Sequence, residues 1–308
     1  MIKEEKINFT AKWCKYSKYK IVDRDDKLYI LPDENSKPST YDPFEVSNEL
    51  LKEMLTIGKE VAENKTININ SNALKYEILS KDEYFQKLVL KFVNKYGLLG
   101  MFKFWPDSYE FITNPELSVS TGRGRYVSAK EFWQRYFCFE TTIDWAGELP
   151  YCIDFSYLTG LNDFMKQTEG DRLDDIVFAR NYAETVSEIL DLAELIYENK
   201  KLINAYFYDE VSEDVKEMYA QSINYQTINN VSLGYSIDGN QVKFEWRFNS
   251  LASIIKTMLL VNETNGRNEV KLCKYCGTPF IANNIKAEYD TPQCRNKANI
   301  YKSRNKNK

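Results

Sequence analysis

The sequence predicts an α+β fold with a mainly helical body and short β-hairpins, followed by a C-terminal treble-clef-like finger. Three observations predict it. Apolar residues recur at three- and four-residue steps in several segments, residues 231–248 alternate with a period of two, and three clustered cysteines lie near the C-terminus. With 308 residues, of which 43% are hydrophobic, the chain can bury one large core or two ordinary ones.

The N-terminal region is predicted to mix strands and helices. Short apolar runs flank two aspartates near residue 25, a pattern typical of a β-hairpin. Asp42 followed by Pro43 predicts the start of a helix that runs to about residue 63, because aspartate caps helices and proline fits their first turn. Another helix is expected from Asp82 to Gly97, where glycine permits a left-handed end.

Further helices and the clearest β-hairpin follow in the second half of the chain. Helical periodicity is strongest from about 172 to 198, and a shorter helix is predicted at 212–221. Residues 231–248 alternate on both sides of an Asp-Gly turn, which predicts a hairpin with one apolar face. The next helix is expected to be capped by Asn249 or Ser250.

A polar stretch at 262–269 interrupts the helical pattern and predicts a boundary. We therefore expect three regions. They are a mixed α+β region at 1–170, a helical and hairpin region at 171–266, and a finger with a basic tail at 267–308.

The composition excludes several classes of enzyme. The chain has no histidine, so Ser-His-Asp and Cys-His hydrolases and HExxH metalloproteases are excluded. Any enzyme would depend on carboxylates, lysine, tyrosine or a metal, and we single out no catalytic residues. The sequence contains no run of eighteen apolar residues and no signal-peptide pattern, so we expect a cytoplasmic protein without a membrane partner.

The cysteine cluster predicts a zinc site. Cys273 and Cys276 are separated by two residues and followed by glycine, which is the spacing of a zinc knuckle. Cys294 comes two residues after Pro292, a good first helical residue, so it should lie in the first turn of a helix. Asp290 stands just before that helix and is the expected fourth Zn²⁺ ligand. A knuckle, then a hairpin, then a helix whose start supplies the second ligand pair is the order of a treble-clef zinc finger. Zinc with a water molecule as fourth ligand, and no metal, remain alternatives.

The C-terminal segment also predicts a nucleic-acid contact. From Lys271 to Lys308 nine basic residues stand against two acidic ones, so the segment carries +7 and the rest of the chain, at −4 overall, carries −11. DNA is expected in preference to RNA, and a small finger needs a second contact or a homodimer for tight binding. The residues predicted to contact nucleic acid are Arg295, Asn296, Lys297, Asn299, Lys302 and Arg304.

Two apolar residues of the predicted terminal helix allow two interpretations. Tyr301 and Ile300 are expected to pack against the small core of the finger. The alternative is that Tyr301 stacks on a nucleic-acid base.

The stretch LCKYCGTPFIANNIKAEYDTPQCRNKANIYKSR resembles the CGNR-type treble-clef finger at the C-terminus of bacterial ABATE-domain proteins. The resemblance covers roughly 172–308, with a long helix, an Asp-Gly hairpin, a further helix and then the finger. It implies a stress-linked transcription regulator that binds zinc and DNA. Two positions depart from the family: Asp290 replaces its usual cysteine, and the CGNR signature reads Cys294-Arg-Asn-Lys here.

The leading hypothesis is therefore a nucleic-acid-binding bacterial regulator. The alternative is a phage-defence or toxin-like protein in which the zinc finger is structural or protein-binding. A third hypothesis is a metal nuclease, based on a loose carboxylate series at 140–154 or on Glu245 of the hairpin. A glycine-basic loop at 121–125 lacks the spacing of a phosphate-binding loop and is interpreted as a surface loop.

Overall fold

The computed structural model describes residues 9–64, 72–100, 118–120, 126–128, 184–208, 212–224, 231–248, 250–264 and 269–305, apart from 10, 12, 25, 34 and 35. The described residues mix helices and strands, with helix as the larger share, and a Cys₃Asp cluster lies near the C-terminus. The short strands β5 (Ser118–Ser120) and β6 (Tyr126–Ser128) pair with each other. The 121–125 loop and the 140–154 carboxylates lie outside the described residues.

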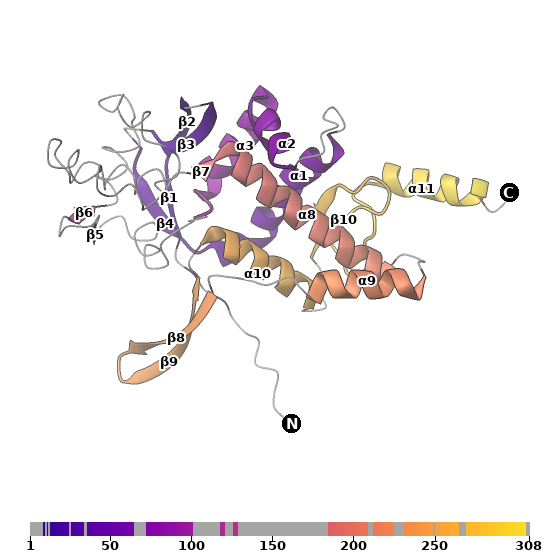
Figure 1. Ribbon diagram of the computed structural model, residues 1–308. Helices are drawn as coiled ribbons and strands as arrows, with labels where there is room; N and C mark the ends of the chain where they lie inside the picture. Colours follow the sequence, from indigo (N-terminus) through magenta and orange to yellow (C-terminus); the bar gives the residue numbers. More distant parts are fainter. Residues whose placement is uncertain are drawn as a thin grey trace.

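The N-terminal strands form two small antiparallel sheets at one end of the body (Figure 1). One sheet pairs β1 (Trp13–Tyr16) with β4 (Pro38–Tyr41). The other has the order β2-β3-β7, formed by Tyr19–Arg24, Lys27–Pro32 and Glu184–Thr185. The hairpin predicted near residue 25 is thus confirmed, and β7 adds a strand from far along the chain.

The two predicted N-terminal helices are confirmed, with their caps. The Asp42 carboxylate accepts a hydrogen bond from the Phe44 backbone N–H at 2.9 Å, and a short 3₁₀ turn η1 (Pro43–Val46) leads into α1 (Ser47–Glu63). Asp82 caps α3 (Glu83–Tyr96) in the same way, and Gly97 follows α3 with a φ of 90°. Between them lies α2 (Asn72–Ser80).

The long helix begins later than its periodicity predicts. Strand β7 occupies 184–185, and α8 runs from Val186 to Tyr208. Thr185 and Glu188 form a reciprocal capping box: the Thr185 hydroxyl accepts from the Glu188 N–H at 3.2 Å, and the Glu188 carboxylate accepts from the Thr185 N–H at 2.9 Å. The T-x-x-E pattern is present in the sequence and is the signal that locates this start.

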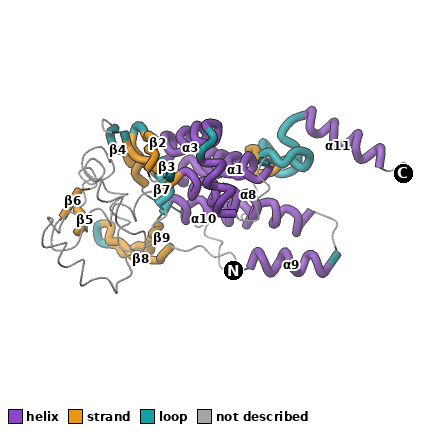
Figure 2. Tube along the Cα trace, turned by 45° about the horizontal axis from the view of Figure 1, so that its top comes forward, coloured by secondary structure: helices purple, strands orange, loops and turns teal. Residues whose placement is uncertain are grey.

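The core lies where α1 crosses α8 in the middle of the molecule (Figures 1 and 2). A β-carbon on Gly58 would collide with the Ala193 carbonyl oxygen and lie 2.6 Å from the Tyr197 Cβ, so the two backbones approach closely there. The buried Glu184 accepts hydrogen bonds from the Leu99 and Gly100 N–H groups, which joins the chain after α3 to the start of α8.

The remaining body elements also match their predictions. Helix α9 spans Glu213–Asn224, and α10 spans Leu251–Thr264 with Ser250 as its cap, because the Ser250 hydroxyl accepts from the Ser253 N–H at 2.9 Å. Strands β8 (Val231–Asp238) and β9 (Gln241–Phe248) form the predicted hairpin, which extends away from the body in Figure 1. Among the described residues, none of the helices combines the length and hydrophobicity needed to cross a bilayer.

Candidate metal centre

A short antiparallel pair brackets the turn that carries the first two cysteines. Strands β10 (Val270–Leu272) and β11 (Pro279–Ile281) pair on either side of it. The Cys273 N–H donates to the Thr278 carbonyl at 2.9 Å, and the Gly277 N–H donates to the Cys273 carbonyl at 2.8 Å. Gly277 has a φ of +67°, which glycine adopts without the steric cost of a β-carbon. The predicted knuckle turn is therefore confirmed.

The start of the last helix brings in the other two donors. Helix α11 (Pro292–Asn305) begins at the predicted proline, and the Thr291 hydroxyl caps it by accepting from the Cys294 N–H at 3.2 Å. Cys294 therefore lies in the first turn, and Asp290 lies just before the cap. Both side chains reach the knuckle, because the Cys294 Sγ lies 3.7 Å and the Asp290 Oδ2 lies 3.9 Å from the Cys276 Sγ.

The four donors lie close enough together to share one metal ion. One ligand atom each from Cys273, Cys276, Asp290 and Cys294 all lie within 4.8 Å of one another. For zinc, ligand bonds of about 2.3 Å to sulfur and 2.0 Å to oxygen give tetrahedral edges of about 3.8 Å between two sulfurs and about 3.5 Å between sulfur and oxygen. The sulfur–sulfur and sulfur–oxygen distances from Cys276 are close to these edges. This compact group can bind a metal ion.

The pKa values of the cluster residues indicate which protons a metal ion has to displace when it binds. Burial raises the pKa of the Cys273 thiol. Hydrogen bonding to Thr291 is the largest single influence on Cys294 and lowers its pKa. Hydrogen bonds to Asp290 and Cys276, burial and the charge of Cys273 together outweigh it and raise that pKa to about 12. Burial opposes ionisation of Asp290, yet hydrogen bonds from the Cys273 and Cys294 thiols hold its pKa below the usual value. A cation therefore has to displace thiol protons as it binds.

The loop between the knuckle and α11 departs from the expected finger. A treble clef places a hairpin there, but no strand forms between 282 and 291. The returning chain is instead held to the knuckle: the Lys274 N–H donates to the Glu288 carbonyl at 3.0 Å, and the Lys274 ammonium pairs with the Glu288 carboxylate at 2.6 Å. Knuckle and helix match the prediction, whereas the hairpin surrounds the knuckle instead of following it.

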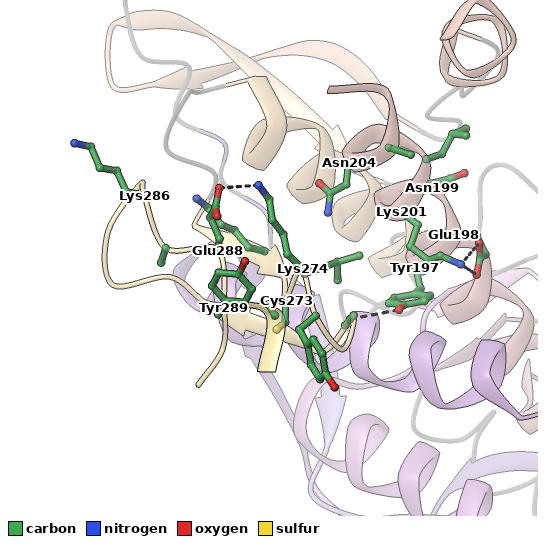
Figure 3. Close-up of a pocket in the computed structure, with 18 of the residues that line it drawn as sticks. Tyr197, Glu198, Asn199, Lys201, Asn204, Cys273, Lys274, Lys286, Glu288 and Tyr289 are labelled. Atoms are coloured by element: carbon green, nitrogen blue, oxygen red, sulfur yellow. Dashed lines mark hydrogen bonds and ion pairs between the residues drawn. The ribbon is translucent and has the colours of Figure 1, made fainter. Parts of the chain in front are cut away.

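The metal module, which we define as residues 269–305, is packed on the body. Val270 and Leu272 belong to the same buried cluster as α1 and α8. The Tyr197 hydroxyl of α8 donates to the Gly277 carbonyl at 3.3 Å, a bond dashed beside Tyr197 in Figure 3. Tyr197 is absent from the predicted site residues, because helical periodicity carries no signal for a contact with a residue 80 positions away.

The predicted nucleic-acid residues lie on α11, which extends away from the body (Figure 1). At about 100° per residue, Arg295, Asn299 and Lys302 occupy one side of the helix. Lys297 and Arg304 occupy the opposite side, and Lys297 Nζ lies 6.0 Å from the Tyr275 ring centroid. The exposed Asn296 lies between these two rows. The six residues therefore form two rows on opposite sides of α11 with Asn296 between them, and they do not share a single stripe. We call the side of the helix that carries Asn296 and these rows its outer face.

The preferred interpretation of Tyr301 and Ile300 is wrong. Tyr301 is 67% exposed and Ile300 is 52% exposed, so neither packs into a finger core. The reason is that, among the positions of α11 whose burial is described, only Cys294 and Ala298 are half-buried, so the rest of the helix has little cover from the module.

Comparison of the chain with protein-family models, with curated proteins and with solved structures finds no match. The function of the protein has to be inferred from the residues and geometry of the site.

Proposed function

We propose that the cluster binds Zn²⁺ through Cys273, Cys276, Cys294 and Asp290. Three thiolates and one carboxylate within 4.8 Å of one another suit zinc, which accepts sulfur and oxygen ligands together. Hard cations such as Mg²⁺ and Ca²⁺ are disfavoured, since they prefer oxygen donors alone. Four protein ligands leave no open position, so the metal has a structural role: it fixes α11 to the knuckle.

We further propose that the metal module binds DNA through the outer face of α11. The observation that carries this proposal is the placement of two basic rows on either side of Asn296, on a helix that extends from the body. A major groove about 12 Å wide admits one helix, and rows on its two sides can then meet the two phosphate backbones. Asn296 would face base edges, where asparagine recognises adenine.

The charge distribution and the sequence resemblance support a regulatory role. The segment from Lys271 to Lys308 carries +7 against −11 for the rest of the chain, so DNA would be attracted to this end only. A single short helix binds DNA weakly, so we propose a homodimer that presents two α11 helices. This role agrees with the bacterial CGNR and ABATE regulators that the sequence resembles, and RNA is the less favoured ligand.

The test combines metal analysis with a salt series. Zinc is measured per chain by plasma mass spectrometry, and affinity for a random-sequence DNA duplex is measured by fluorescence anisotropy at several salt concentrations. We expect one zinc per chain and a steep loss of affinity with salt. The variant Arg295→Ala/Lys297→Ala, with one residue from each row, should reduce the log–log salt slope by about 2.

The matched control removes two charges elsewhere. Lys18 and Lys87 have side chains that are 69% and 75% exposed and lie in the N-terminal half. Lys18→Ala/Lys87→Ala should leave the slope unchanged. Equal effects of the two double variants, or no duplex binding at low salt, would refute the DNA contact.

A second candidate is a metal centre that serves only stability or protein binding. The observation that favours it is the burial of Val270 and Leu272 in the body core, together with the Tyr197–Gly277 hydrogen bond. If the metal centre is only structural or protein-binding, the function that we propose instead is a phage-defence or toxin-like role. It predicts stoichiometric zinc and a loss of thermal stability on chelation, with no salt-dependent DNA binding.

A further inference from the structure

A groove separates helix α8 from the metal module. Its volume is about 1640 Å³, larger than the roughly 300–1000 Å³ of typical small-molecule pockets. One wall is formed by Tyr197 to Ala205 of α8, and the other by the knuckle and the loop from Ile285 to Tyr289 (Figure 3). Ala298 and Tyr301 of α11 also line it. A groove of this size can take a ligand larger than a typical small molecule.

The lining combines aromatic rings with positive charge. The groove contains five tyrosines, four lysines, two asparagines and only two carboxylates. Its formal charge is therefore +2, although the chain outside the C-terminal segment is strongly acidic. Positive grooves with aromatic side chains on which bases stack are the common design of proteins that bind single-stranded nucleic acid.

Two of these rings are exposed enough to receive a base. Tyr275 is 45% exposed and Tyr301 is 67% exposed, whereas Tyr197 is buried and forms part of the wall. Neither Tyr275 nor Tyr301 belongs to the body core. An aromatic ring that is exposed beside a positive groove gains burial when a base stacks on it.

The lysines can exchange their present partners for phosphates. Lys201 pairs with Glu198 at 2.9 Å and Lys274 with Glu288 at 2.6 Å, and all four side chains are 41–50% exposed. Exposed pairs of this kind are weak, so a phosphate can replace the carboxylate at little cost. In Figure 3 the Asn204 amide points into the space between these pairs, where it can bond a base edge.

We propose that this groove binds a short stretch of single-stranded nucleic acid, with bases on Tyr275 and Tyr301 and phosphates at Lys201 and Lys274. Paired bases are stacked inside a duplex and cannot reach these rings, so the ligand has to be unpaired. The inference builds on the proposed nucleic-acid function and adds a second contact of a different kind. The shared chemistry is a sugar-phosphate chain with free bases, whether DNA or RNA.

The test uses single-stranded probes on the full-length, zinc-replete protein. Affinity for oligonucleotides of about fifteen thymidines and of about fifteen uridines is measured beside that for a blunt duplex. Tyr301→Ala should weaken single-strand binding about tenfold and leave duplex binding unchanged, while Tyr301→Phe should retain it. Lys201→Ala should reduce the single-strand salt slope by about 0.7. Preference between the two probes identifies DNA or RNA as the source.

The control for the aromatic change is Tyr84→Ala, because Tyr84 is 52% exposed on α3 and does not line the groove. Equal single-strand affinity of Tyr301→Ala and Tyr84→Ala would overturn the inference. The inference would also be overturned if single-strand binding were lost in Arg295→Ala/Lys297→Ala but kept in the groove variants, since the strand would then lie on the outer face of α11. Either result would overturn the single-strand inference but leave the proposal of duplex binding by α11 intact. If the unmodified protein bound neither single strands nor duplex, both proposals would be refuted.

Discussion

The metal module and the β8–β9 hairpin both extend from the same body, but different interactions hold them (Figures 1 and 2). In the module, four potential metal ligands from the knuckle and the start of α11 lie within 4.8 Å of one another, and the β10–β11 pair packs against α1. The hairpin is held by its own ladder and by its base, where the Phe248 and Phe44 ring centroids are 5.3 Å apart. Towards its tip Phe244 is 86% exposed.

This difference shows how little local pattern says about burial. Apolar residues occupy every second position of both hairpin strands, and the cross-strand pairs Leu233–Trp246 and Tyr235–Phe244 confirm one apolar face. Within the described part of the chain, that face is nevertheless largely uncovered. Helix α11 has no apolar stripe, yet its first turn lies against the knuckle, where the Cys294 and Cys276 Sγ atoms are 3.7 Å apart. Contacts at one end can position a polar helix, whereas alternation of apolar and polar residues only orients side chains.

The largest effect should come from removing the metal ligands. Cys276→Ser/Cys294→Ser should abolish stoichiometric metal binding and release α11, because structural zinc sites contribute about 10 kcal/mol or more to folding. Hydrogen exchange should then rise across 273–305 and stay unchanged in the β8–β9 hairpin. Increased exchange in the hairpin would show that the two regions are coupled.

Close packing in the body should be the next most sensitive feature. Gly58→Ala places a methyl group against the Ala193 carbonyl and Tyr197, so the free energy of unfolding should fall by about 3 kcal/mol. Gly239→Ala is the matched change in the hairpin: φ there is +60° and no atom lies within 4 Å, so only backbone strain of about 1 kcal/mol is expected. Urea denaturation measures both, and equal losses would contradict this difference.

Metal affinity of the module should depend on pH. The pKa of Cys294 is about 12 and that of Cys273 is also raised, so both thiols release protons when the ion binds. Affinity should therefore rise with pH and fall as pH decreases, by up to about tenfold per unit for each proton released. Competition with a chromophoric chelator between about pH 6.5 and 8 measures this. A metal affinity that did not change with pH would contradict thiolate ligation. In the same assay, Asp290→Cys should bind zinc more tightly than Asp290→Asn.

The smallest effect should be on the hairpin surface. Phe244→Ser removes a ring that is 86% exposed, so the free energy of unfolding should change by less than about 0.5 kcal/mol. Phe92→Ala, at a ring that is 1% exposed, should lower it by about 3–5 kcal/mol. Urea denaturation again gives both values. A loss from Phe244→Ser approaching that of Phe92→Ala would show that the hairpin face is covered in solution.

Sequence reasoning was most successful where structure depends on neighbouring residues. The caps at Asp42, Asp82, Ser250 and Thr291 were predictable because a cap bond spans only two or three residues. The candidate metal ligands were predictable for the same reason, since a two-residue spacing brings two thiols together. The start of α8 was missed although its capping box is equally local.

By itself, therefore, the sequence determined most of the helices, the β2–β3 and β8–β9 hairpins and the four candidate ligands, but not α2 or the start of α8. Only the tertiary structure decided which apolar faces are covered, that Tyr301 is exposed, and that a groove lies between α8 and the metal module. The physical reason is separation along the chain: Tyr197 and Gly277 are 80 residues apart, yet their hydrogen bond places the module on the body. Burial depends on such distant neighbours, and no local period or spacing encodes them.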